Sequence, residues 1–432
     1  MNRLLIMLLL TLAAFRSHAQ LSFHNLGELL DFADKYGIVG KQSVLQYQIS
    51  KKDETISRSA LLPKVNIFGT ADYYPLIPVL VVPEAVTGGS APDKFQKVQL
   101  GLPWSFSAGA EVTMPVINLG KWETLKRYKL MSVQTDWNNK TNQETLHIQL
   151  TQSYYQALLA KAMLDLNHEN EQISDELLRI LEERKKNNVL DPADYNRSKN
   201  LQLDIRTAGI DYEKNYIQAI IALRQQLHLD GHTSMELLDS VESGSWMQLP
   251  EETALSGRPG WKAAEAGIAV ADEQVKESKK AGLPAISFDG KYTYQTQIDK
   301  TISQHITYDF SDVGLRLDFP IFQGNYYKAS RQKSEMQLEL AKLSQQQTID
   351  DLTRQQSEWR NNYQAALKKQ PVLQQKLELT SDNLRIARLN MREGVMEFEE
   401  FNNIFQEYIK SRMDYLQNIS DGIVSRLLLT LK

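Results

Sequence analysis

Apolar and polar residues alternate without a break between residues 98 and 116. A period of two places the even and the odd positions on opposite faces of a β-sheet. The sequence therefore predicts one long strand with an apolar face on its even side. The even positions are Val98, Leu100, Leu102, Trp104, Phe106, Ala108, Ala110, Val112, Met114 and Val116.

The same strand signals occur twice in the chain. Residues 62–69 (LPKVNIFG) return as 283–290 (LPAISFDG), and residues 109–116 (GAEVTMPV) return as 314–321 (GLRLDFPI). The two offsets are 221 and 205 positions, so the first copy has the longer loop between its strands. This self-similarity indicates that the chain consists of two structural repeats.

The alternating strands are typical of two different settings. A half-buried hairpin of a soluble protein shows this pattern, and so does a strand of a membrane barrel, which needs only about 9–11 residues to cross a bilayer. The aromatic residues Tyr73, Trp104, Tyr292 and Tyr294 would suit the interfacial girdles of such a barrel. In the membrane setting the apolar face contacts lipid. The residues expected there are Val98, Leu100, Leu102, Trp104, Phe106, Leu315, Leu317 and Phe319.

Each pair of strands is followed by a long segment that favours helix. Residues 121–190 contain neither Gly nor Pro, and residues 325–393 contain no Gly and one proline, Pro371. At 1.5 Å per residue each segment would form a rod of roughly 100 Å. A thin, interrupted heptad pattern in the second rod favours helices that pack side by side in a curved wall. Because Pro371 removes one internal hydrogen bond, we expect a kink or a local unwinding there.

Each rod ends in a turn followed by a shorter return helix. The first turn is expected near Asn188, where Asp191-Pro192 is a good helix start, and the second near Gly394. Two further helices are predicted to run into the Leu-Pro signals, over 41–61 and 258–282. A loop-like connection over 228–250 separates the copies.

These signals predict the organisation of the whole chain. Residues 1–19 resemble a signal peptide, with an apolar stretch too short to span as a helix and a small-x-small cleavage site at 17–19. The first repeat covers 20–230 and the linker 231–250, and the second repeat covers 251–432. The expected elements are a hairpin over 62–117, a long helix over 120–187 and a return helix over 192–228, and then a hairpin over 283–323, a long helix over 325–392 and a return helix over 397–430.

Composition removes several classes of function. There is no cysteine, so disulfides, thiolate metal sites and a cysteine nucleophile are excluded. A net charge of −4 offers no basic footprint for nucleic acid. No phosphate loop, dinucleotide fingerprint or nucleophile elbow is present, so an enzyme is not expected. His228 and His232 are four apart but have Gly231 between them and no third ligand nearby, so neither a metal nor another cofactor is predicted.

With these signals the chain resembles the outer-membrane efflux protein family typified by TolC. The resemblance covers nearly all of the mature chain, through the order, spacing and duplication of its signals. Two segments are similar to family motifs: 258–265 (RPGWKAAE) to a helix start, and 318–324 (DFPIFQG) to a strand-to-helix junction. The resemblance implies a mainly α fold with a transmembrane β-barrel portion. Each protomer of a homotrimer would give four strands to one 12-stranded barrel, continuous with an α-helical periplasmic tunnel.

The resemblance also implies partners and sites. The partners would be a periplasmic adaptor, an inner-membrane pump and outer-membrane lipid. Adaptor contacts are expected at the helical tips, and a pore constriction at two positions of the second return helix. The constriction positions are Glu400 and Asn403, where the family has two acidic residues, so one charge is missing here. The tip residues are Lys186, Asn188, Val189, Leu190, Asp191, Arg392, Gly394, Val395, Met396 and Glu397.

Two functions compete on this evidence. The first is a passive exit duct of a tripartite efflux or secretion system in the outer membrane. The second is a periplasmic coiled-coil scaffold or adhesin with soluble hairpins. Drugs, metal ions and proteins all remain open as cargo, because a wide duct does not select cargo as a fitted pocket does.

Overall fold

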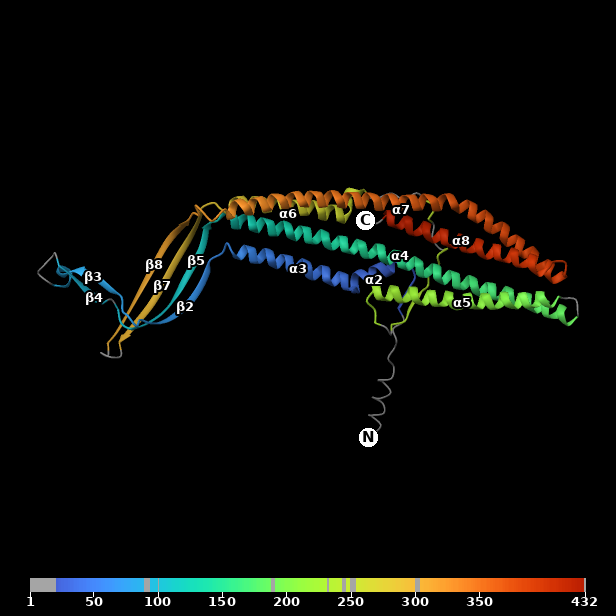
Figure 1. Cartoon of the computed structure of the whole chain (residues 1–432), viewed down its shortest axis with the longest axis horizontal. Coiled ribbons are helices and arrows are strands. Elements are labelled where there is room, and N and C mark those ends of the chain that lie inside the picture. Colours follow the sequence, from blue (N-terminus) through green and yellow to red (C-terminus); the bar gives the residue numbers. More distant parts are fainter. Residues whose placement is uncertain are drawn as a thin grey trace, which may run out of the picture. The chain divides into compact units, whose positions relative to one another are not determined.

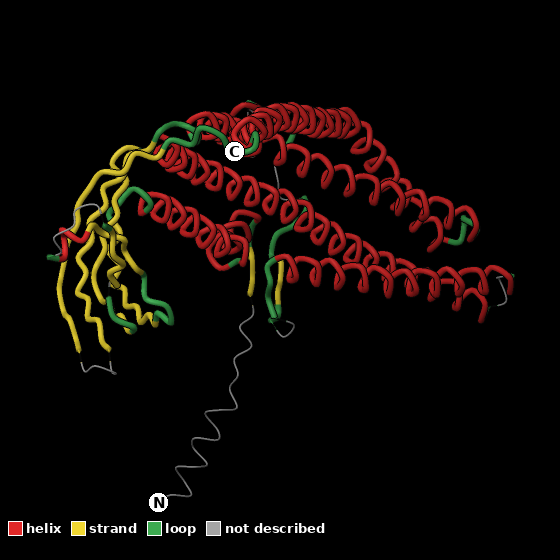
Figure 2. The backbone as a smooth tube through the Cα atoms, turned by 60° about the vertical axis from the view of Figure 1, so that its left-hand side comes forward, coloured by secondary structure: helices red, strands yellow, loops and turns green. Residues whose placement is uncertain are grey.

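The computed structural model describes residues 21–430 except 89–93, 100, 188–190, 231–232, 243–245, 249–253 and 300–303. The expected signal peptide lies outside these residues. The chain divides into a helical unit (residues 1–47, 135–265 and 344–432) and a strand-bearing unit (residues 48–134 and 266–343). In Figure 2 most of the strands lie together, and short strand segments lie beside the helices. This mainly helical fold with strand hairpins and long helices confirms the expected class.

The strand-bearing unit contains one four-stranded antiparallel sheet in the order β2-β5-β7-β8 (Figure 1). The strands are β2 (Lys64–Tyr73), β5 (Trp104–Ile117), β7 (Ala285–Asp299) and β8 (Gln304–Asp318). The two repeats meet at the β5–β7 pair, which leaves β2 and β8 as the edges. Pro63 and Pro284 stand just before β2 and β7, where a missing N–H removes no ladder hydrogen bond.

The register assigns each side chain of the sheet to one of two faces, because direct partners point to the same side. On the polar face, the Asn66 amide donates to Glu111 (3.1 Å) and the Gln295 amide donates to Ser105 (2.8 Å). On the apolar face, the rings of Tyr73 and Trp104 lie 4.7 Å apart. The even positions of β5 thus share one face, as the alternation predicts.

The expectation of one strand over 98–116 is wrong. The chain forms β4 (Phe95–Gln99), then turns at Gly101, whose φ is +105°, and starts β5 only at Trp104. β4 pairs with β3 (Val79–Pro83) in a separate two-stranded hairpin. A positive φ is accessible to glycine, and it breaks the ladder although the apolar alternation continues across it. The long loop expected in the first copy is therefore this extra hairpin.

The helical unit is built around two helical hairpins. The first consists of α4 (Leu119–Lys186) and α5 (Pro192–Gln226), and the second of α7 (Tyr326–Glu393) and α8 (Phe398–Thr430). Both long helices have 68 residues and extend from the strand-bearing unit into the helical unit. α7 stays α-helical at Pro371, so the expected local unwinding does not occur. The shorter helices are α2 (Leu26–Tyr36), α3 (Ile38–Ser59) and α6 (Pro259–Lys280).

The connection between the repeats is not simply a loop. Its strand β6 (Met235–Leu237) pairs in parallel with β1 (Leu21–Phe23), and Trp246 is buried in the main core of the helical unit. The Tyr363 hydroxyl is close to two acceptors, the carbonyls of Trp246 (2.9 Å) and Gln248 (2.7 Å). A Cβ on Gly422 would lie 2.3 Å from the Trp246 ring, so the missing side chain of Gly422 makes room for this tryptophan.

A second core lies toward the hairpin turns. Its centre is formed by Leu181 of α4, Ala387 and Met391 of α7, and Phe401 and Phe405 of α8. These side chains are almost completely buried. The second core therefore holds the ends of the two hairpins together by apolar contact.

Candidate functional site

The turn between α7 and α8 has a conformation that its glycine provides. Gly394 has a φ of +80°, and the N–H of Val395 donates to the carbonyl of Asn390 (3.1 Å). The Arg184 guanidinium donates to the carbonyl of Met391, so α4 contacts the end of α7. Val395, Glu397 and Arg392 are exposed, and Met396 is half-buried.

The turn between α4 and α5 is described only at its two ends. Lys186 is exposed and is the last residue of α4, and the Asp191 carboxylate accepts from the N–H of Ala193 (2.8 Å) to begin α5. Asn188, Val189 and Leu190 lie outside the described residues. The expected helix start at Asp191-Pro192 is confirmed.

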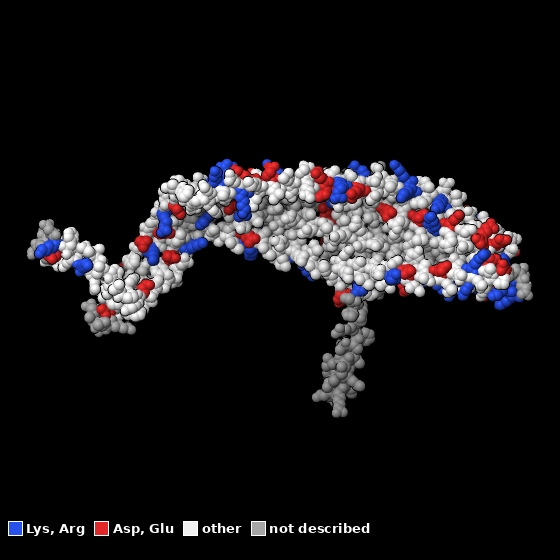
Figure 3. All heavy atoms as spheres, viewed as in Figure 1, with Lys and Arg blue, Asp and Glu red and all other residues white. Residues whose placement is uncertain are grey.

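Near these turns a half-buried carboxylate joins α4 to α7. Glu176 of α4 has an 18% exposed side chain, and it accepts hydrogen bonds from Arg388 (2.5 Å) and from Nε of Arg392 (2.8 Å). Burial alone would raise its pKa, but the hydrogen bonds from Arg392 and Arg388 outweigh this and hold the pKa of Glu176 below its ordinary value. The charged form of Glu176 therefore clamps the two long helices together. Figure 3 shows charged side chains of both signs where the hairpins end.

Glu400 and Asn403 lie on the outside of α8. Phe398, Phe401 and Phe405 turn into the second core, whereas Glu400 and Asn403 are exposed. Further exposed polar residues follow along α8 at helical spacing: Glu407, Lys410, Gln417 and Asp421. The two predicted constriction residues thus begin a polar stripe. Whether they line a pore stays a prediction.

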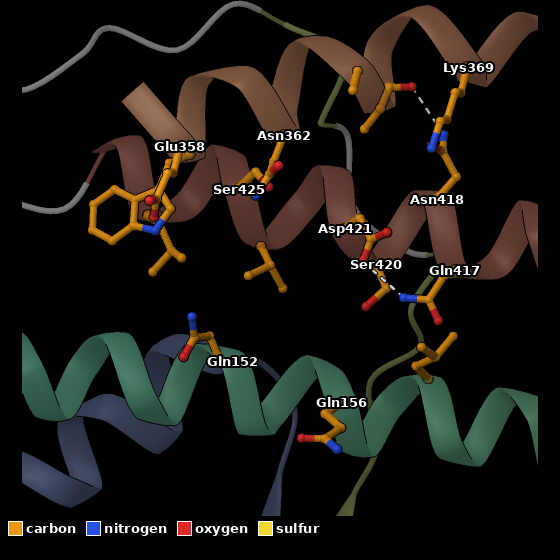
Figure 4. Close-up of a pocket in the computed structure, with 16 residues that line it drawn as sticks. Gln152, Gln156, Glu358, Asn362, Lys369, Gln417, Asn418, Ser420, Asp421 and Ser425 are labelled. Carbon is orange, nitrogen blue, oxygen red and sulfur yellow. Dashed lines mark hydrogen bonds between the residues drawn. The ribbon is translucent and has the colours of Figure 1, made fainter. Parts of the chain in front are cut away.

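The polar stripe ends at a hollow in the helical unit, which the sequence reasoning missed. A cavity of about 770 Å³ lies between α4 on one side and α7 and α8 on the other. Figure 4 shows amide, hydroxyl and carboxylate groups from these helices around it. Gln417 donates to Asp421 (2.9 Å), and Asn418 donates to Gln370 (2.9 Å). In the sequence, the only sign of this hollow is that Gln152 and Gln156 are four residues apart, which places both amides on one face of α4.

A second missed feature is a pair of buried carboxyls near the start of α4. A hydrogen bond between Glu123 of α4 and Glu273 of α6, together with the ammonium groups of Lys280 and Lys126, lowers the pKa of Glu123 to about 2. Burial together with that hydrogen bond raises the pKa of Glu273. Lys280 donates to Glu123 (2.5 Å) and Lys276 to Glu273 (3.1 Å), so α4 and α6 are connected by a charged network.

The structure places only some of the predicted lipid-facing residues on the apolar face of the sheet. Trp104, Phe106, Leu315 and Leu317 lie on the apolar face of the four-stranded sheet, and exposed Phe319 follows β8. Val98 belongs to the separate β3–β4 hairpin, Leu102 lies in the connection to β5, and Leu100 lies outside the described residues. Lipid contact itself stays a prediction. None of the described helices has an apolar stretch long enough to cross a bilayer.

The described residues contain no group of three or more His, Asp or Glu side chains that could hold a metal. His228 has a left-handed backbone with a φ of 53°, and His232 lies outside the described residues. The candidate sites described above are the helical tips, the polar stripe with its hollow, and the two faces of the sheet.

Comparison with known proteins finds a family model that matches part of the chain. The family model described as outer membrane efflux protein matches residues 252–417, which include β7, β8, α7 and the turn at Gly394. The match thus lies within the second repeat of the chain. No curated protein sequence matches the chain significantly. The expected resemblance is confirmed, and the protein is an outer membrane efflux channel and not an enzyme.

Solved structures share the fold over almost the whole chain. CusC superposes with a TM-score of 0.77 at 15% identity, covering 94% of this chain and 90% of that one. VceC from Vibrio cholerae gives 0.74 at 12% identity, covering 94% of both chains. The open state of MtrE from Neisseria gonorrhoeae gives 0.71 at 15% identity, covering 94% and 89%. The chain therefore shares the fold of these three proteins.

Proposed function

We propose that the protein works as the trimeric exit duct of a tripartite efflux or secretion system. In this proposal it spans the outer membrane with its strands. A periplasmic adaptor contacts its helical tips and connects it to an inner-membrane pump. The proposal refines the family's role, outer membrane efflux, into an assembly and a set of contacts.

The observation that carries the proposal is a pair of exposed apolar seams on two different helices. Both seams repeat every seven residues, which is the spacing of a coiled-coil contact. In the protomer these side chains are exposed although they are large and apolar. The seam of α5 consists of Leu203, Ile210 and Ile217, and the seam of α7 consists of Val372, Leu379 and Ile386.

Two different seams favour a ring of copies. When the α5 seam of each copy contacts the α7 seam of the next copy, the contact is heterologous. Such contacts generate a closed ring if the rotation between copies closes. The same arrangement occurs in the strand-bearing unit, where α3 exposes Ile49 and Ile56 and α7 exposes Met336 and Leu340. A ring would bury both pairs of seams.

The sheet leads to the same proposal by an independent argument. β2 and β8 are edge strands, and each presents unpaired backbone N–H and C=O groups. In lipid such edges are too costly to persist, so β8 of one copy would pair with β2 of the next. Three four-stranded sheets would then close into one ring of twelve strands, with the apolar face toward lipid.

The tips and the polar stripe complete the proposed duct. Exposed Val395 at the Gly394 turn would offer an apolar contact to an adaptor, and exposed Lys186 and Arg392, near the ends of α4 and α7, would offer positive charge. Threefold symmetry would bring three Glu400 side chains toward one axis, where gathered like charges attract cations. Asn403, one turn further along α8, would add a polar ring without charge.

Cysteine cross-linking tests the ring directly, because the chain has no cysteine of its own. Ile210→Cys and Val372→Cys would be placed in separate chains and expressed together. We expect oxidation to join the two chains into a disulfide-linked dimer. As a matched control, exposed Asp211→Cys of α5, beside the seam, is paired with Val372→Cys. A monomer in detergent, or equal linkage from both positions of α5, would refute the ring.

A further inference from the structure

The two faces of the sheet are exchanged in the first half of β8. Direct partners share a face, and this half of β8 pairs with Gln297, Gln295 and Thr293, which lie on the polar face. Their partners in β8 are Ile306, Tyr308 and Phe310, which are apolar and which we call the inverted patch. The rings of Tyr308 and Phe310 lie 6.3 Å apart.

The inverted patch has a polar counterpart on the other side of the same strand. His305, Thr307 and Asp309 lie on the face that is otherwise apolar, and Asp309 accepts from the Tyr292 hydroxyl (3.1 Å). All three side chains of the patch remain substantially exposed, Tyr308 by 42%. An apolar patch of this kind on a polar face needs a cover.

The β3–β4 hairpin also exposes apolar side chains on one face. One of its faces carries Val79, Val81 and Phe95, and all three side chains are more than half exposed. An isolated two-stranded hairpin is only marginally stable in water, so a surface that covers these residues would stabilise it. Lys97, the direct partner of Val81, adds a positive charge to the same face. We call this set the hairpin face.

The register places these two surfaces at the same end of the sheet. Tyr73, Trp104, Ile298 and His305 form one row across the four strands. The chain therefore leaves β2 for the hairpin at the level where the inverted patch begins. In a closed ring, β8 of the neighbouring copy lies one strand spacing from β2, about 4.8 Å, whereas its own β8 lies three spacings away, about 14 Å.

We propose that the hairpin face of one copy packs on the inverted patch of the neighbouring copy. The occupant of the patch is thus a second copy of this chain, and the inference rests on the proposed trimer. Apolar residues meet apolar residues, and Lys97 comes near Asp312, which follows the patch on the same face of β8. Three such contacts form a collar at the end of the sheet away from the helices, narrow the outer mouth of the duct and lock neighbouring copies together.

The absence of cysteine again allows a direct test. Val81→Cys and Tyr308→Cys are placed in separate chains, expressed together and oxidised in intact outer membranes. The matched control is Leu80→Cys, combined with the same Tyr308→Cys chain, because Leu80 lies on the opposite face of the hairpin. The Ile210→Cys and Val372→Cys pair serves as the control for the ring.

We expect a disulfide-linked dimer from Val81→Cys and at least a tenfold weaker one from Leu80→Cys. Charge reversal adds a second readout: Lys97→Asp should weaken the cross-link, and Asp312→Lys in the partner should restore it. If the ring control links but Val81→Cys does not, or links no better than Leu80→Cys, the collar is refuted while the trimer stands. If the ring control also fails, the trimer itself is refuted and the collar with it.

Discussion

Truncating Leu379 should separate the stability of the trimer from that of the protomer. Complete burial of a leucine side chain is worth about 1.5–3 kcal/mol. Leu379 is still 60% exposed in the protomer, so a seam that covers the rest contributes about 1–2 kcal/mol per copy. With three equivalent seams, Leu379→Ala should cost the trimer about 3–6 kcal/mol, or about two to four powers of ten in dissociation constant.

The assay is dilution of the detergent-solubilised protein, with the fraction of trimer followed by native mass spectrometry. Thermal unfolding of the protomer should shift little, because the side chain contacts little within one copy. Glu378→Ala, a neighbouring exposed position outside the seam, is the matched control.

A double-mutant cycle tests the partner helix. Ile210 of α5 is 69% exposed, and Ile210→Ala should also weaken the trimer. If the two seams touch, Ile210→Ala and Val372→Ala, which alter the pair chosen for cross-linking, should couple by at least about 0.5 kcal/mol. Simple additivity would place the seams apart. A trimer unaffected by Leu379→Ala would refute the reasoning from exposed heptads altogether.

Four further predictions concern single sites. Gly422→Ala should displace Trp246 and destabilise the helical unit by about 1–3 kcal/mol, seen in urea unfolding with tryptophan fluorescence, and an unchanged midpoint would contradict the close packing. Gly394→Val should strain the turn by about 1–2 kcal/mol because its φ is +80°, so protease cleavage at the tip should rise, with Val395→Ala as the control. Because folding lowers the pKa of Glu176, its charged form stabilises the folded state at pH values above its unfolded pKa, and this stabilisation is lost as pH falls through its folded pKa. Acid should therefore loosen the tips of the wild type, measured as faster hydrogen exchange, and Glu176→Gln should respond less. Glu400→Gln should reduce cation selectivity and block by multivalent cations in single-channel recordings, and unchanged traces would remove Glu400 from the constriction.

Much of the architecture follows from local signals in the sequence. The long helices end within a residue or two of the predicted positions, because Asp191-Pro192 and Gly394 act on the backbone next to them. The apolar face of β5 follows from a period of two, which holds wherever the chain is extended. The duplication was visible for the same reason, since each repeat carries its own strand and turn signals.

Other features depend on contacts between distant segments. The alternation runs through Gly101 unchanged, so only the pairing of β4 with β3 shows that the strand is broken. Trp246 stands among Gly, Ser and acidic residues typical of a loop, and it is buried because Gly422 leaves space for it on α8. Neither outcome has a local signal, because the partner lies elsewhere in the chain.

The surfaces that carry the proposals were also decided by tertiary structure. A heptad pattern marks which residues of α7 are apolar, but only packing shows that Tyr363 faces the core while Val372 and Leu379 remain exposed. Likewise, the apolar residues of β8 are plain in the sequence, whereas their exchange between the two faces appears only from the register with β7. Periodicity specifies which side chains share a side of an element, and the neighbouring elements determine which side is covered.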